Sequence, residues 1–203
     1  MAPAHRIPLI GLTGALAAGK SVALEALGRL GAETLSSDAI VHELLGSERV
    51  RDLLVGRWGE RVAPGGTIDR GAVGAIVFGD PAELAWLESV LHPLVGERTA
   101  AWRSTLPPDT RLAVLEVPLL FETGMEALFD ATISIVADDR LRVERAGARG
   151  TGELEAREDR QLSQDEKSAR ATYVVRNEGS LDQLEAELGA VIKRIEAAAK
   201  ETV

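Results

Sequence analysis

Cysteine is absent from this chain of 203 residues, which excludes disulfide bonds and cysteine metal sites. Its absence agrees with a reducing cytosol. Aromatic residues make up only 3% of the sequence, so leucine, valine, isoleucine and alanine must do most of the packing. No uninterrupted apolar run is long enough to span a membrane. We therefore expect a soluble, cytoplasmic protein with an aliphatic core and no membrane partner.

Positive charge is also scarce, because the formal net charge is −9 at pH 7. Such a surface repels phosphate backbones, so we do not expect general nucleic-acid binding. One phosphorylated small molecule is still compatible, because a local field can oppose the net charge. Apolar residues at 45% are enough to fill a core, and the length fits one domain over 1–203 with an inserted lobe. The composition leaves the oligomeric state open.

The first apolar stretch has two interpretations. Basic residues precede the run 7–18, and an A-x-A pattern inside it resembles a short secretory signal. The alternative is a buried strand followed by a loop that binds phosphate. We favour the second interpretation, because it also accounts for the Gly-Lys-Ser sequence that follows.

Buried runs alternate with helical segments along the chain. Strands are expected at 6–13, 33–36, 111–117, 131–137 and 173–175. Helices are expected at 19–30, from Ser37 or Asp38 onward, and at 181–199. This alternation predicts an α/β fold with a mainly parallel five-stranded sheet covered by helices on both faces.

Two further segments are predicted to be helical subdomains. The stretch 48–106 forms a substrate lobe with breaks at 64–66, at 79–81 and at His92-Pro93. Asp69 and Asp80 are predicted helix caps, and three tryptophans are expected to pack the lobe. The charged segment 138–170 is expected to form a helical lid.

The strongest local signal is the segment Gly14–Ser21, GALAAGKS, which matches G-x-x-x-x-G-K-[ST]. It lies between a predicted strand and a predicted helix, which disfavours a chance match. The glycines let the backbone wrap tightly and point its N–H groups at phosphate oxygens, aided by the helix N-terminus. Lys20 is expected to reach the β- and γ-phosphates of ATP, and the Ser21 hydroxyl to bind Mg²⁺.

The wider sequence narrows the class of P-loop protein. A guanine-reading N-K-x-D motif and a transporter-type L-S-G-G-Q signature are both absent. The arginine-rich segment late in the chain is typical of a kinase lid, which excludes water and brings positive charge to the transferring phosphoryl. We therefore predict phosphoryl transfer from Mg·ATP to a small molecule with a hydroxyl group. Asp38 follows the second strand, where it could orient or deprotonate that hydroxyl, hold a magnesium-bound water, or be an ordinary N-cap.

Several segments together resemble the dephospho-CoA kinase family. Ile10–Gly14 (IGLTG), Ser36–Ile40 (SSDAI), 67–70 (TIDR), 87–93 (LESVLHP) and Glu116–Glu122 (EVPLLFE) follow that family's order and pattern. Gln161, Lys167 and Asn177 stand where the family has Q, K and N near its end. The resemblance covers nearly the whole chain, and the combination is far more specific than any single segment.

The resemblance implies ATP-dependent phosphorylation of the 3′-hydroxyl of dephospho-CoA, the last step of coenzyme A synthesis. The implied catalytic residues are Lys20, Asp38 and Arg145. The residues implied to hold ATP are Gly14, Ala15, Leu16, Ala17, Ala18, Gly19, Lys20, Ser21, Val22, Arg149 and Asn177. Those implied for the acceptor are Asp38, Arg70, His92, Pro118, Leu119 and Glu122, and those for the metal are Ser21 and Glu116. Which of Arg145 and Arg149 is the main lid arginine stays open.

Simpler roles stand beside several of these assignments. Arg70 could pair with a surface carboxylate, His92 could be a helix-start histidine, and Glu122 could be a structural anion that positions an arginine. Arg142 is expected to be a solvated charge. The sequence departs from the family pattern at Ala15, Ser36, Glu116 and Thr172. Alternative functions are a kinase for another metabolite, such as a nucleoside or nucleotide, and a regulatory protein that binds ATP without transferring it.

Overall fold

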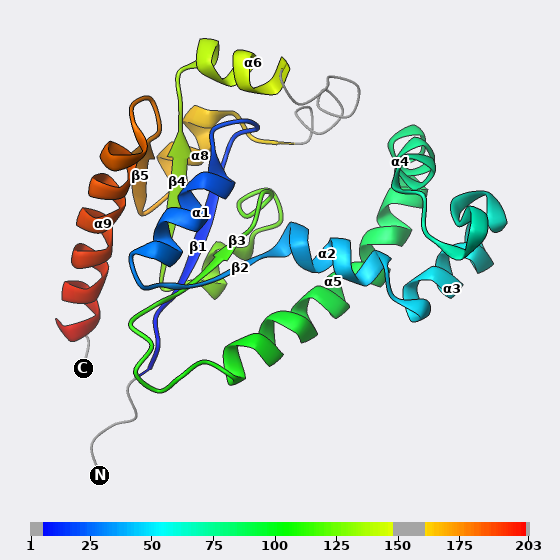
Figure 1. Cartoon of the computed structure of the whole chain (residues 1–203), viewed down its shortest axis with the longest axis horizontal. Helices are drawn as coiled ribbons and strands as arrows, with labels where there is room; N and C mark the ends of the chain where they lie inside the picture. The colour runs from blue at the N-terminus through cyan, green and yellow to red at the C-terminus, as the bar shows by residue number, and fades with distance from the viewer. Residues whose placement is uncertain (1–5, 148–160, 202–203) are drawn as a thin grey trace. The chain divides into compact units, whose positions relative to one another are not determined.

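A computed structural model describes residues 6–147 and 161–201. Its strands form one parallel sheet, in the order β2-β3-β1-β4-β5. The strand bounds are β1 (Leu9–Gly14), β2 (Glu33–Ser36), β3 (Ala113–Glu116), β4 (Ala131–Val136) and β5 (Tyr173–Arg176). The predicted α/β fold is confirmed, and β1 lies at the centre of the sheet (Figure 1).

The chain divides into two compact units. We call Met1–Ser36 together with Leu106–Val203 the sheet unit, and Ser37–Thr105 the helical unit. The helical unit begins at Ser37, where β2 passes directly into α2 (Ser37–Leu45), whereas the sequence placed the start of the lobe at residue 48. The helix after β2 thus belongs with the inserted segment.

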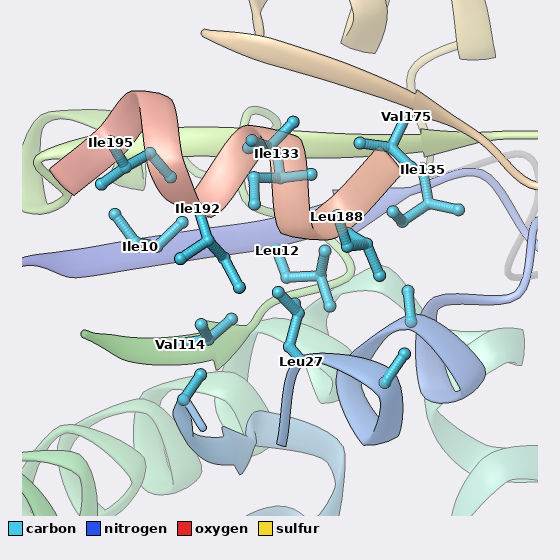
Figure 2. Packing of buried hydrophobic residues seen from close by; sticks show 14 of the residues in the cluster. Ile10, Leu12, Leu27, Val114, Ile133, Ile135, Val175, Leu188, Ile192 and Ile195 are labelled. Atoms are coloured by element: carbon cyan, nitrogen blue, oxygen red, sulfur yellow. The ribbon is translucent and has the colours of Figure 1, made fainter. Parts of the chain in front are cut away.

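One face of the sheet is covered by α1 (Lys20–Arg29) and α9 (Leu181–Glu201). Figure 2 shows side chains of these helices meeting Ile10, Val114 and Ile133 from three strands. All three side chains are fully buried in this aliphatic cluster. Each such side chain contributes about 1.5–3 kcal/mol of transfer free energy, so aliphatic packing suffices where aromatics are few.

The opposite face is covered by α8 (Gln164–Arg170) and by the chain that follows β3. That chain includes the short helix η3 (Met125–Leu128) and carries the buried side chains of Leu120 and Phe121. Gly11 of β1 faces this layer, and a Cβ there would lie 2.4 Å from Cδ1 of Leu120. The absence of a side chain at Gly11 therefore lets this layer approach the central strand. A further helix in the described part of the sheet unit is α6 (Asp139–Gly147).

The helical unit contains α2, α3 (Glu48–Trp58), α4 (Arg70–Gly79) and α5 (Pro81–Ser104), with short turns η1 (Glu60–Val62) and η2 (Pro64–Gly66). Asp69 caps α4 by accepting hydrogen bonds from the backbone N–H groups of Gly71 and Ala72. Asp80 caps α5 by accepting from Ala82, and Pro81 occupies the first turn. Both predicted caps are confirmed.

The predicted break at His92-Pro93 is wrong, because α5 continues through both residues for 24 residues in all. Proline lacks the N–H that would bond the carbonyl one turn earlier, so one helical hydrogen bond is lost. Leu87, Leu91 and Leu94 are buried along the same helix, and their packing maintains it across the proline. His92 is consequently an exposed mid-helix residue and does not start a helix.

Tryptophans pack the helical unit, as expected. The rings of Trp58 and Trp86 meet edge to face at 5.1 Å between centroids, and Arg57 lies 5.2 Å from the Trp86 centroid. Glu83 accepts hydrogen bonds from the Trp58 indole and from Arg57. Hydrogen bonding from Arg57, and then from Trp58, holds the pKa of the Glu83 carboxyl below its ordinary value. Within residues 6–147 and 161–201, no helix has the length and apolarity needed to span a membrane.

Candidate active site

The segment Gly14–Ser21 curls between the end of β1 and the start of α1. Gly14 is the last residue of β1, and a Cβ there would lie 2.5 Å from the Ile135 carbonyl oxygen. Gly19 precedes α1 with φ of 96°, in the left-handed region. Ala17 also has positive φ, at 59°. Ala15 has no such conformation, so its methyl group is accommodated where the family pattern has a glycine.

The Lys20 side chain bonds back to the start of its own loop. Its ammonium donates to the backbone carbonyls of Gly14 at 3.1 Å and of Ala15 at 3.2 Å. The lysine is thus folded back onto the carbonyls at the start of the loop, at the amino end of α1. A single cation held among backbone groups at a helix N-terminus is the arrangement that binds polyphosphate in P-loop proteins.

Asn177 and Arg145 come to the same loop from distant parts of the sheet unit. Asn177 follows β5, is buried, and donates from Nδ2 to the Ala18 carbonyl at 2.9 Å. Arg145, in α6, donates from Nη2 to the Asn177 carbonyl at 3.2 Å. Its Nη1 is buried without a hydrogen-bond partner within the described part of the chain. The structure therefore brings these two predicted residues together beside Gly19, and it leaves one guanidinium donor available for an anion.

Arg142 contradicts the expectation of a solvated charge. Its side chain is 15% exposed, and Nε donates to the Leu16 carbonyl at 2.9 Å. Nη1 donates to Asp139 at 2.9 Å. The acceptor is a backbone carbonyl at the loop tip. Charge patterning does not reveal such an acceptor, so this contact could not be predicted. Arg142 also lines a cavity of about 500 Å³ between the loop tip and the start of α8.

The two candidate metal residues both belong to the sheet unit. Ser21 is an exposed residue in the first turn of α1. Glu116 ends β3, is 5% exposed, and accepts a hydrogen bond of 2.5 Å from the Ser36 hydroxyl. Ser36 ends the neighbouring strand β2, so the departure from aspartate at this position supplies a donor for Glu116 instead of a second carboxylate.

A buried ion pair lies behind the turn that follows β3. The Lys167 ammonium is fully buried, 2.9 Å from Glu122 Oε1 and 2.6 Å from the Pro118 carbonyl oxygen. Burial lowers the pKa of Lys167, and Glu122 opposes that shift. The predicted arginine partner of Glu122 is therefore a lysine. Only the family resemblance singled out Lys167, because Lys167 and Glu122 are far apart along the chain and both residue types are usually exposed.

The remaining acceptor-side residues lie in the helical unit. Asp38 is exposed in the first turn of α2, one position after the helix start, so it is not the N-cap. Arg70 contacts Nδ1 of His42 at 2.5 Å through Nη1, which is a different partner from the surface carboxylate considered above. His92 is exposed on α5. Arg149 lies outside the described residues, as does much of the segment 138–170.

A model of the dephospho-CoA kinase family matches residues 8–183. The chain belongs to this family. A dephospho-CoA kinase from Deinococcus radiodurans is 38% identical over 191 residues, which cover 92% of each chain. The same order of loop, strands and inserted helical unit is therefore expected throughout these relatives.

Solved structures agree with this membership. The structure of TT1252 from Thermus thermophilus is 37% identical, with a TM-score of 0.81 over 93% of this chain and 98% of that one. A dephospho-CoA kinase from Campylobacter jejuni is 26% identical, with a TM-score of 0.62 over 93% and 97% of the two chains. The sheet unit and helical unit described above thus have counterparts in kinases of this family.

Proposed function

We propose that this chain transfers the γ-phosphoryl group of ATP to the 3′-hydroxyl of dephospho-CoA, giving CoA and ADP. The observation that carries the proposal is the loop Gly14–Ser21 with Lys20 folded over it, in a chain of the dephospho-CoA kinase family. We also propose that it acts in the cytoplasm, where ATP is available. The acidic net charge supports a small-molecule substrate over a nucleic acid.

The ATP side of the site is built from backbone groups and two cations, Lys20 and Arg145. Loop N–H groups and the amino end of α1 hold the phosphate oxygens. Lys20 leaves the Gly14 and Ala15 carbonyls and bonds the β- and γ-phosphates instead. The unpartnered Nη1 of Arg145, in the part of the chain described, fits an anion beside Gly19. Arg145 then stabilises charge on the transferring group, which is the main demand of a loose transition state.

Mg²⁺ fits the residues present on chemical grounds. The Ser21 hydroxyl is a suitable oxygen ligand, and Glu116 is a candidate for holding a metal-bound water. Residues 6–147 and 161–201 contain no cluster of three or more histidines and carboxylates that could hold a metal by themselves. This is compatible with an ion bound mainly through substrate phosphates and waters. When bound, Mg²⁺ would neutralise phosphate charge.

Six residues are proposed to act on the acceptor. Asp38, Arg70 and His92 belong to the helical unit, and Pro118, Leu119 and Glu122 belong to the sheet unit. Asp38 orients the ribose hydroxyl and accepts its proton as the bond to phosphorus forms. Arg70 and His92 offer positive charge and hydrogen bonds to the anionic acceptor. Because the transition state is loose, placing the hydroxyl in line matters more than removing its proton early.

The direct test is to incubate the purified chain with ATP, Mg²⁺ and a panel of acceptors, and to identify products by mass spectrometry. CoA and ADP in equal amounts from dephospho-CoA are expected. ADP with a different phosphorylated acceptor would replace the proposed substrate with a nucleoside, nucleotide or other metabolite. ATP binding without turnover of any acceptor would favour the regulatory function.

Lys20→Ala tests the loop assignment within the same assay. Loss of the phosphate-binding cation should lower kcat on the order of 10²-fold or more, because the contact between lysine and phosphate is strongest in the transition state. Lys193, which lies on α9, provides the control, and Lys193→Ala should retain wild-type kcat. Near-normal turnover by Lys20→Ala would contradict the loop's role.

A further inference from the structure

The Pro118 carbonyl connects three segments of the sheet unit through hydrogen bonds. It accepts a hydrogen bond from the Thr13 hydroxyl at 3.2 Å and from the Lys167 ammonium at 2.6 Å. Thr13 is fully buried and immediately precedes the phosphate loop. Lys167 comes from α8 and is itself fully buried. One backbone oxygen therefore links the loop strand, the turn after β3 and α8.

Glu122 extends these connections to a fourth segment. Its Oε1 lies 2.9 Å from Lys167 Nζ and also accepts from the backbone N–H of Leu162 at 2.8 Å. Leu162 lies just after residues 148–160 and lines the cavity at the loop tip. Both charges are removed from water, which costs desolvation free energy. Short hydrogen bonds between the two groups and to their neighbours are needed to offset that cost.

We infer that Lys167 is a positioning residue for phosphoryl transfer: it fixes the turn Pro118–Glu122 against the phosphate-loop strand and against the chain at Leu162. The inference rests on the proposed function, because the turn carries the candidate acceptor residues Pro118, Leu119 and Glu122. Lys167 has no exposed surface on which a substrate could rest. It acts by setting the position of backbone groups that lie beside the loop.

The arrangement of bonds explains why a lysine is suited to this position. A long flexible arm reaches from α8 to the Pro118 carbonyl, and an ammonium can donate to that carbonyl and to a carboxylate at once. A methionine of similar length fills the same space but donates to neither. Positional errors of about 1 Å near a reacting group can cost on the order of 10²-fold in rate, so a loosened turn should appear in kcat.

The decisive variant is the double substitution Lys167→Met with Glu122→Gln. It removes both charges, and glutamine still offers an oxygen to the Leu162 N–H. The lysine's links are lost together with the Glu122 charge, and Glu122→Gln alone measures the effect of that charge. We expect kcat for CoA formation to fall by roughly 10- to 100-fold, with KM for ATP within about twofold of wild type. Wild-type kcat in this variant would overturn the inference.

The single variants separate positioning from stability. Lys167→Met leaves a buried carboxylate without its cation and should lower Tm by roughly 10 °C. Glu122→Gln alone leaves the lysine unpaired but keeps its bond to Pro118. It should therefore be less stable than the double variant yet have the higher kcat. If kcat follows Tm across the three variants, the role is structural only and the inference fails.

Two further measurements complete the test. Arg111→Ala, which breaks a surface pair with Glu196 in the same unit, should leave kcat unchanged. In the wild-type chain, the Leu162 amide should exchange its hydrogen as slowly as amides of β1. Fast exchange would show that the bond from Leu162 to Glu122 does not hold this segment, and the inference would fail. A wild-type chain that makes no CoA would instead contradict the proposed function.

Discussion

In the sheet unit, the groups proposed to bind ATP are backbone amides and side chains that bond backbone carbonyls. In the helical unit, the residues proposed to bind the acceptor are exposed side chains on helices. Lys20, Arg142, Arg145 and Asn177 each bond a main-chain oxygen of the sheet unit. Asp38 and His92 are exposed on α2 and α5. We therefore expect substitutions at the ATP-binding loop of the sheet unit to lower both activity and stability. Substitutions of exposed residues of the helical unit, such as Asp38, should lower activity alone.

Gly19→Ala should give the largest combined loss of activity and stability, and so it tests the first half of the comparison. A Cβ there would lie 2.0 Å from Nδ2 of Asn177, and φ of 96° disfavours any side chain. We expect CoA formation to fall by at least about 10²-fold, and Tm to fall with it. Steady-state kinetics and calorimetry on one preparation measure both quantities.

Gly56→Ala is the matched control in the helical unit. Gly56 lies inside α3, and no atom is within 4 Å of a Cβ placed there. Alanine should raise stability by up to about 1 kcal/mol with unchanged kcat. If both glycine variants behaved alike, the proposed contrast between the units would be lost.

Arg145→Ala should come next. Removing an arginine that stabilises the transferring phosphoryl is expected to lower kcat on the order of 10³-fold. Because Arg145 also bonds the Asn177 carbonyl, KM for ATP should rise as well. Arg140→Ala, an exposed position on the same helix, should keep wild-type kinetics. Equal losses in the two variants would point to damage to α6 and not to lost charge stabilisation.

Asp38→Asn tests the second half of the comparison. We expect kcat to fall by roughly 10²-fold while Tm stays within about 1 °C, because Asp38 is exposed. Glu43→Gln, exposed on the same helix, should change neither quantity. A fall in Tm as large as that of Gly19→Ala would show that function and folding are not separable in this unit.

Glu83→Gln should have the smallest effect and concerns stability alone. The pKa of Glu83 is lowered in the folded state, so its contribution is present above the unfolded pKa and is lost as pH falls through the folded pKa. The variant should be less stable than wild type near neutral pH, and the two should converge in acid. Calorimetry from pH 7 down to about pH 3 tests this, with Glu97→Gln on α5 as the control.

Most of the fold could be predicted because its signals are local. Buried aliphatic runs gave the strands, and the sequence Gly14–Ser21 between strand and helix gave the loop. Side-chain caps such as Asp69 depend on neighbours two and three residues away, so they too were predictable. Pro93 was misjudged because helix propensity is local, whereas the packing of Leu91 and Leu94 that maintains α5 is not.

The parts of the site that could not be predicted depend on contacts between distant residues. Arg142 bonds a carbonyl at Leu16, and Lys167 bonds one at Pro118. Every residue has a main-chain oxygen, so the sequence does not indicate which of them accepts a hydrogen bond. A charged residue that binds one therefore has the sequence pattern of a surface residue. The family resemblance singled out Lys167 by position but could not say which atoms it holds.

The placement of the aromatic residues gives each unit its own optical signal. All three tryptophans lie in the helical unit, where Trp58 is 8% exposed beside Trp86. The single tyrosine, Tyr173, lies on β5 in the sheet unit. Indole fluorescence therefore reports the helical unit by itself. We expect titration with dephospho-CoA to change this emission in the unlabelled chain, because Asp38, Arg70 and His92, proposed to bind the acceptor, belong to the same unit.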